Sequence, residues 1–99
     1  MKLWVDDLRP APQGYVWCHS TAEAISLIRS NDIEILSLDH DAGSYAMLGG
    51  DYIAILNWME ESGYGSHVDR IHIHSMNPVG VANMRRIISQ NGWTETRYL

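Results

Sequence analysis

Three short groups of side chains in the sequence could carry out chemistry if they lay together. Each follows an apolar stretch: Asp6 and Asp7 follow LWV, Asp39 to Asp41 follow LSL, and His74, Ser75 and Asn77 follow IHI. Carboxylate oxygens are the ligands that Mg²⁺ prefers. Histidines transfer protons near neutral pH, and the first turn of a helix binds anions. Together these groups predict phosphate chemistry beside a divalent cation.

Each group taken alone also has a purely structural explanation. Asp6 could shape a turn and pair with Arg9, while Asp39 and Asp41 could accept backbone N–H groups in a loop. A histidine on a strand is more often a structural residue than a catalytic one, and Asn77 before a proline is a sufficient helix start. The combination favours a site, because four carboxylates at one edge repel one another unless a cation neutralises them or some take up protons.

The composition limits the class of protein. With 99 residues, 45% of them hydrophobic, the chain is expected to form one globular domain over residues 1–99. No apolar run approaches the roughly 20 residues that cross a membrane, and the acidic start MKLWVDD is unlike a signal peptide, so we expect a cytoplasmic protein without a membrane partner. The net charge of −5 argues against duplex DNA as a partner. The single Cys18 is expected to be a buried, inert thiol. Oligomeric state has no signature in the sequence.

Strands and helices alternate along the chain and would position these groups. β-branched and aromatic runs predict strands at 2–5, 15–18, 33–38, 71–74 and 93–98. The predicted helices run from Ser20, whose capping box includes Glu23, to about Ser30, from a cap at Asp51 to the glycine at 63, and from Asn77 to the glycine at 92. Helical crossovers favour a mostly parallel sheet, whose ligand sites lie beyond the carboxyl ends of the strands. All three groups should therefore meet at one edge of the sheet.

The motifs LWVDDLRPAP, LSLDHDAG and IHIHSMNPVG, in this order over nearly the whole chain, resemble the signatures of the cyclic-phosphate processing receiver family. This family is a divergent branch of response-regulator receiver domains. The resemblance implies a flavodoxin-like α/β fold, with a three-layer sandwich around a mostly parallel five-stranded sheet in the order 2-1-3-4-5. It also implies the processing of cyclic phosphates, such as 2′,3′-cyclic phosphate ends of RNA or cyclic nucleotides. The partner would be a small phosphate-bearing ligand or an RNA end.

Carried over by motif, Asp39 stands at the phosphoacceptor position of receivers, and the DD of the first motif is the acidic pair. Two features depart from an ordinary receiver. Receivers place a lysine at the end of the fifth strand, whereas the only lysine here is Lys2 and the last predicted strand offers only Arg97. The segment 6–14 holds two prolines, so the first crossover helix is expected to be shortened or absent. Both departures argue against an aspartyl-phosphate switch.

We therefore expect a metal-assisted phosphodiesterase that acts on a strained cyclic phosphate. A divalent metal, Mg²⁺ or Mn²⁺, would polarise the phosphoryl group and activate water. Its predicted ligands are Asp6, Asp7 and Asp39. The predicted catalytic residues are His40 and His74, as base and acid, with Asp41 orienting one imidazole. The predicted substrate-binding residues are Arg9, Ser75 and Asn77.

Other functions stay open from the sequence. A metal-free mechanism with two histidines would leave the aspartates unexplained. The same donors could hold a cyclic nucleotide or a phosphorylated ligand without turnover, which makes a binding module the main alternative. A regulatory receiver phosphorylated on Asp39 would lack its lysine. A protein-interaction domain is the last candidate, because four tryptophans could include exposed anchors.

Overall fold

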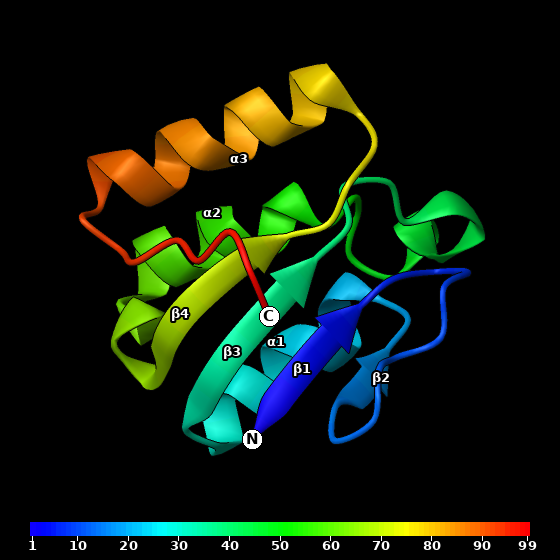
Figure 1. The fold of residues 1–99 in the computed structure, drawn as a ribbon, viewed down its shortest axis with the longest axis horizontal. Helices are drawn as coiled ribbons and strands as arrows, with labels where there is room; N and C mark the ends of the chain where they lie inside the picture. Colours follow the sequence, from blue (N-terminus) through cyan, green and yellow to red (C-terminus); the bar gives the residue numbers. More distant parts are fainter.

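The computed structural model describes all residues from 1 to 99 and shows a parallel sheet with helices packed against it (Figure 1). The elements follow the chain in the order β1 (Lys2–Val5), β2 (Val16–Cys18), α1 (Thr21–Ser30), β3 (Ile33–Leu38), the short 3-10 helix η1 (Gly43–Met47), α2 (Ile53–Ser62), η2 (Tyr64–His67), β4 (Val68–Ile73) and α3 (Pro78–Gln90). All strand pairs are parallel, in the order β2-β1-β3-β4. The predicted α/β class and parallel sheet are confirmed. No helix separates β1 from β2, as the prolines of that segment predicted.

The predicted fifth strand is wrong, and the sheet has four strands. After α3 the chain makes a single parallel bridge to β4, between Ile71 and Glu95. The amide of Ile71 donates to the carbonyl of Thr94 at 2.9 Å, and its carbonyl accepts from the amide of Thr96 at 2.8 Å. Trp93, predicted as the first residue of this strand, packs against the core instead of pairing with β4. The remaining segment is largely polar, so it lacks the apolar cross-strand pairs that would extend the bridge into a strand.

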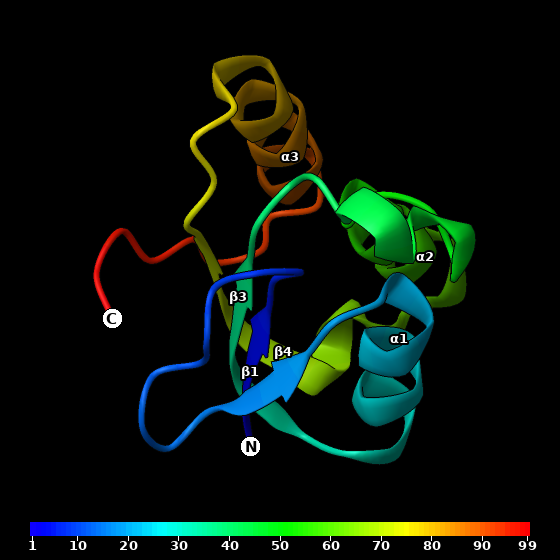
Figure 2. The same ribbon diagram turned by 90° about the vertical axis from the view of Figure 1, so that its right-hand side faces the viewer.

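The helices share one core on one face of the sheet, so the predicted three-layer sandwich is also wrong. In Figure 2, α1 and α2 lie on one side of the strands, while the loop after β1 and the C-terminal segment lie on the other. To the same core α3 contributes Met84 and Ile88, and the sheet contributes Leu3, Val5, Leu36, Leu38 and Ile71. In the order β2-β1-β3-β4, the connection from β1 to β2 crosses the sheet in one direction and the later connections cross it in the other. A right-handed crossover helix between β1 and β2 would therefore lie on the opposite face from the three helices. Because that connection holds no helix, loops cover the second face.

Most of the predicted helix ends are confirmed. The hydroxyl of Ser20 accepts from the amide of Glu23 at 3.1 Å at the start of α1. The side chain of Asn77 accepts from the amide of Gly80 at 3.0 Å at the start of α3. Gly63 ends α2 with a φ of 80°, a backbone conformation that favours glycine.

Several predicted boundaries differ from the structure, and β2 begins at Val16 rather than at residue 15. Asp51 does not cap α2, because Tyr52 occupies the cap position without a side-chain bond. Asp51 instead accepts from the amide of Ala42 at 3.0 Å and ties the loop after β3 to the start of α2. The strand β4 begins earlier than predicted, at Val68, and it ends before His74. That histidine therefore lies just beyond the strand, at the carboxyl edge of the sheet.

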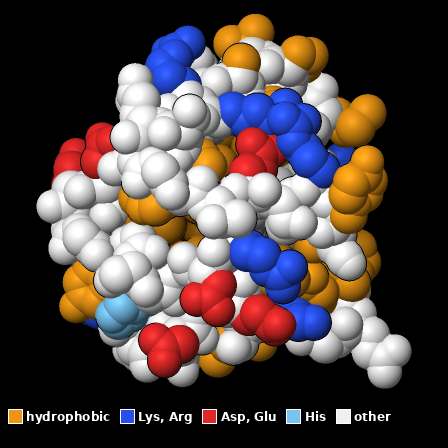
Figure 3. Space-filling model, turned by 60° about the vertical axis from the view of Figure 1, so that its left-hand side comes forward, with side chains coloured by type: hydrophobic (Ala, Val, Ile, Leu, Met, Phe, Trp, Pro, Cys, Tyr) orange, Lys and Arg blue, Asp and Glu red, His pale blue; other side chains and the backbone are white.

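No helix in the structure has both the length and the apolar character needed to cross a membrane. On the face shown in Figure 3, basic side chains lie beside acidic ones and form no continuous basic surface. The ion pairs of the chain include Lys2 and Arg70 with Glu34, and Arg85 and Arg97 with Glu95. In these groups the basic side chains are neutralised by their neighbours rather than presented to a polyanion.

Candidate functional site

The three groups singled out in the sequence lie at the carboxyl edge of the sheet. Asp6 follows β1, Asp39 follows β3 and His74 follows β4. The amide of Asp39 donates to the carbonyl of Val5 at 3.0 Å, and the amide of His74 donates to the carbonyl of Leu38 at 2.9 Å. These bonds extend the strand pairing by one step and fix the groups beside one another. The neighbours β1 and β3 are also where the strand order reverses, which is where parallel α/β sheets bind their ligands.

Asp6, Asp7 and Asp39 form a carboxylate cluster at this edge. Each offers one oxygen, and these oxygens lie within 4.8 Å of one another. One oxygen of the buried Asp6 accepts from the amides of Leu8 and Arg9, at 2.9 and 2.8 Å. One oxygen of Asp39 accepts from the amide of the next residue at 2.8 Å. The backbone therefore fixes two of the three carboxylates directly.

The carboxylates of the cluster affect one another's ionisation. Burial tends to raise the pKa of Asp6, but two backbone amides and the imidazole of His74 outweigh it and hold that pKa below its ordinary value. Burial raises the pKa of Asp7, and three neighbouring carboxylates raise it further. A divalent cation would relieve this repulsion, and three oxygen ligands on strand ends suit Mg²⁺ or Mn²⁺. The donor set therefore fits the predicted metal.

His74 contacts the carboxylate cluster, and its ring is enclosed by side chains of the protein. Its Nε2 lies 2.9 Å from the second oxygen of Asp6, and its Nδ1 lies 2.8 Å from the hydroxyl of Ser37. Its ring stacks on Trp4 with the centroids 3.7 Å apart and the planes 2° apart. Burial lowers the pKa of His74, and Asp6 opposes that effect. Both nitrogens are therefore occupied by partners from the protein.

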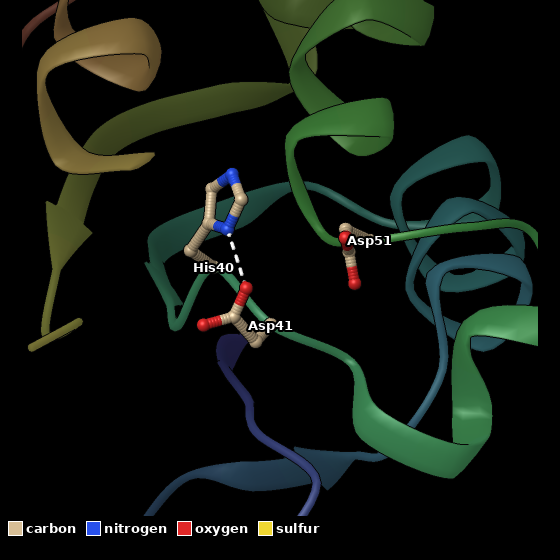
Figure 4. A group of neighbouring side chains, drawn as sticks. All are labelled: His40, Asp41 and Asp51. Carbon is tan, nitrogen blue, oxygen red and sulfur yellow. Dashed lines mark hydrogen bonds and ion pairs between the residues drawn. The ribbon is translucent and has the colours of Figure 1, made fainter. Parts of the chain in front are cut away.

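His40 and Asp41 form a second ionisable pair, shown in Figure 4. The Nδ1 of His40 lies 2.9 Å from an oxygen of Asp41, and together with Asp51 they offer ligand atoms within 4.8 Å of one another. In Figure 4 the Nε2 of His40 points away from Asp41. When Asp41 accepts from Nδ1–H, the lone pair is on Nε2. The pair thus has the arrangement of an oriented general base.

The three residues predicted to bind substrate lie near the site, and all three already have structural partners. Asn77 caps α3, and the hydroxyl of Ser75 accepts from the amide of Asn77 at 3.1 Å. Arg9 donates to the carbonyl of His74 at 3.3 Å, and its Nε lies 4.0 Å from Asp6. The Arg9 side chain is about half exposed, and its remaining nitrogen, Nη2, is free to bind an anion.

An open cavity of about 510 Å³ lies along the first turns of α3. Its lining residues are Ser75, Met76, Pro78, Val81, Ala82 and Arg85. Ser75 is the only residue predicted for the site among them, and no carboxylate lines the cavity. The cavity therefore borders the site without containing its ionisable groups.

Sequence reasoning missed two residues that support the site, Ser37 and Trp4. Ser37 is fully buried in β3 and bonds to His74 and His72, and Trp4 supports the ring of His74 from β1. The available signal was a hydroxyl in the apolar run of the strand, which is interrupted otherwise only by Glu34, directly before the Asp39 motif. A polar group buried there needs a partner, and the partners come from a distant strand.

A parallel α/β sheet that gathers carboxylates at the edge where its strand order reverses defines a receiver-like domain. The family model of the cyclic-phosphate processing receiver domain matches residues 1–90, and the chain belongs to this family. No curated protein and no solved structure shows a significant match to the chain. The resemblance stated from the sequence motifs is therefore confirmed.

Proposed function

We propose that this domain is a metal-assisted phosphodiesterase that opens cyclic phosphates, such as a 2′,3′-cyclic phosphate at an RNA end or a cyclic nucleotide. The observation that carries the proposal is the cluster of Asp6, Asp7 and Asp39, whose oxygens lie within 4.8 Å of one another beside the pair of His40 and Asp41. A hard cation site next to an oriented imidazole provides charge neutralisation and proton transfer, which phosphodiester hydrolysis needs. Family membership supports the substrate class.

Asp6, Asp7 and Asp39 would hold the divalent cation. When bound, Mg²⁺ or Mn²⁺ would polarise a phosphoryl oxygen and lower the pKa of a water molecule. The chain's own contribution is rigidity, because Asp6 is buried and bonded to two amides and to His74. Ligands held in place before binding lose little freedom when the cation arrives.

His40 is the residue best placed to move a proton. Asp41 holds its Nδ1–H, so its Nε2 would accept a proton from the attacking water. His74, predicted from the sequence as the acid, has both nitrogens bound and a side chain only 6% exposed. We therefore assign His74 to holding Asp6. The leaving oxygen would take its proton from solvent, because the site is open to water at Asp41, whose side chain is 62% exposed.

Two features of the chain would hold the phosphate oxygens. The Nη2 of Arg9 has no partner within the protein, and this charged donor suits contact with a phosphate oxygen. The start of α3 lies against His40, since Gly80 in its first turn contacts the ring. The partial positive charge at a helix N-terminus favours an anion there. The anion would then lie between Arg9 and the first turn of α3.

The test is ring opening of 2′,3′-cyclic AMP and 3′,5′-cyclic AMP, with Mg²⁺, with Mn²⁺ and with chelator, followed by chromatography. We expect turnover that needs the metal and is lost in Asp39→Asn. His40→Ala is expected to lower the rate by roughly 10²- to 10⁴-fold. Asp69→Asn, exposed near the opposite end of β4, is the matched control and should retain full activity. Turnover that continues in chelator, or that keeps the wild-type rate in His40→Ala, would contradict the proposal.

A binding module that does not turn over its ligand is the second candidate, and one observation favours it. The occupied nitrogens of His74 leave the site with a single free imidazole, that of His40, for proton transfer. In that case the cyclic nucleotides would raise the melting temperature without being consumed. The same chromatography beside a thermal melt distinguishes the two functions.

The remaining alternatives from the sequence gain no support. A regulatory receiver needs a lysine near Asp39, but Lys2 lies at the amino end of β1 and pairs with Glu34. An interaction domain was suggested by the tryptophans, yet none of the four is exposed. Two of the indoles, those of Trp4 and Trp17, instead donate to backbone carbonyls within the domain.

A further inference from the structure

A chain of hydrogen bonds runs from β4 to Asp6, and its centre is Ser37. The hydroxyl of Ser37 lies 2.8 Å from the Nδ1 of His72 and 2.8 Å from the Nδ1 of His74. The Nε2 of His74 lies 2.9 Å from an oxygen of Asp6. Ser37 is fully buried, and it pairs in register with His72 on one side and Trp4 on the other. The chain therefore lies on the sheet face that carries no helix.

The donors and acceptors of these groups determine the direction of the chain. An ionised Asp6 only accepts, so the Nε2 of His74 donates to it. The hydroxyl of Ser37 has one proton and two imidazole partners, so it donates to one and accepts from the other. With both imidazoles neutral, His74 carries its single proton on Nε2, so its Nδ1 accepts from the hydroxyl of Ser37. Ser37 then accepts in turn from the Nδ1–H of His72.

We propose that Ser37 is a positioning residue of the site, whose hydroxyl holds His74 in the orientation that donates to Asp6. His72 orients this hydroxyl by donating to it. Ser37 lies inside β3 rather than at the edge of the sheet, so it acts through His74. The placement of one oxygen of Asp6 thus depends on the hydroxyl of the second-to-last residue of the neighbouring strand β3. The direction of the hydrogen bonds is independent of the proposed function, whereas the effect on metal binding and turnover rests on it.

The surroundings leave His74 no equivalent replacement for Ser37. Trp4 covers one face of the ring, and its own indole nitrogen donates to the carbonyl of Arg9 at 2.9 Å, so the stack is fixed in place. Without the hydroxyl, the Nδ1 of a ring with little exposure would lack a partner, which is a costly state. The ring would then turn to find another partner and release the second oxygen of Asp6, while the first stays bonded to the amides of Leu8 and Arg9. A residue far from Asp6 in sequence would thereby control the position of one of its oxygens.

The direct test is ¹⁵N NMR of the histidine side chains in the wild-type protein at neutral pH, without metal or substrate. We expect His74 to be protonated at Nε2 and unprotonated at Nδ1, and His72 to be protonated at Nδ1. A proton on the Nδ1 of His74, or none on the Nδ1 of His72, would overturn the proposal. The measurement requires no variant to fold, and its result stands even where the domain turns over no cyclic phosphate.

A second experiment measures Mg²⁺ binding and turnover in Ser37→Ala, which removes the hydroxyl, and in Ser37→Thr, which keeps it. Supporting groups of this kind change metal affinity by about 10- to 100-fold, so Ser37→Ala should weaken Mg²⁺ binding by that factor in calorimetry. It should also lower kcat while KM changes little, and Ser37→Thr should restore both quantities. Ser89→Ala, exposed near the end of α3, is the control. Equal Mg²⁺ affinity in Ser37→Ala and wild type would overturn the positioning role, whereas Mg²⁺ binding without any turnover in wild type would overturn the proposed function alone.

Discussion

Gly80, in the first turn of α3, lies directly against the imidazole ring of His40. A Cβ built on Gly80 would come within 2.5 Å of the Cγ and Cδ2 atoms of that ring, far closer than van der Waals contact allows. The backbone of Gly80 is ordinary helix with a negative φ, so its conformation does not require glycine. The requirement comes from His40, which occupies the space that a side chain would fill.

Gly80→Ala is therefore expected to impair the site instead of stabilising the helix. In an unhindered helix interior this change gains about 1 kcal/mol, but here the methyl group would displace His40. A misplacement of this kind should lower kcat by roughly 10- to 100-fold with no gain in melting temperature. Steady-state kinetics and thermal denaturation measure both effects. Val79→Ala, at an exposed neighbouring position, is the control, and a Gly80→Ala protein that is more stable and fully active would contradict the contact.

Asp7→Asn is expected to stabilise the domain without metal and to abolish its response to Mg²⁺. Burial and the neighbouring carboxylates raise the pKa of Asp7, so its ionised form is disfavoured in the folded state. A neutral side chain removes this repulsion, which should gain about 0.5 to 1 kcal/mol. Added Mg²⁺ should raise the melting temperature of wild type but not that of the variant. Thermal melts in chelator and in Mg²⁺ measure both effects, with Asp69→Asn as the control. If Asp7→Asn were less stable than wild type in chelator, the repulsion among the carboxylates would be absent.

The stability of the domain is expected to fall as the pH drops below about 6.5. Burial lowers the pKa of His72 and His74 below the ordinary value of 6.5 in the folded state. The unfolded chain keeps the ordinary value and binds more protons in this range, so acidification favours unfolding. The two neutral histidines make their full contribution to stability above the pKa of the unfolded chain. That contribution is lost as the pH falls toward their lowered pKa values in the folded protein.

Thermal melts between about pH 8 and about pH 5.5 measure this dependence. The double variant His72→Gln and His74→Gln should show a flatter profile than wild type. Ser89→Ala, which changes no titratable group on the exposed face of α3, should keep the wild-type slope. A melting temperature that rises on acidification would be incompatible with the lowered pKa values.

Cys18 is expected to be unreactive in the folded protein. Burial, with a smaller effect of Glu23, raises the pKa of its thiol to about 12. Because the thiolate is the reactive species, iodoacetamide at about pH 8 should modify the chain only after unfolding. Mass spectrometry of native and denatured samples checks this. Rapid modification of the native protein would show that the thiol is accessible.

The sequence was sufficient to predict the features that depend on neighbouring residues. The bounds of β3, Ile33–Leu38, follow from its apolar run, and the Ser20 cap and the Gly63 stop follow from residues within one turn. The positions of the three ionisable groups after strands are equally local, because each motif adjoins its own strand. Parallel pairing then brings them to one edge, which made the carboxylate cluster predictable.

Only the tertiary structure decided which partner each polar group takes. The side chain of Asp51 accepts from the amide of Ala42 rather than from the first turn of α2, and His74 is enclosed by Ser37 and Trp4 instead of being free. The segment after α3 forms one bridge through Glu95 and no strand. These outcomes depend on competition among groups far apart in the chain. A local pattern shows that a polar group or a strand segment needs a partner, but the choice among possible partners is fixed by burial and register across the folded sheet.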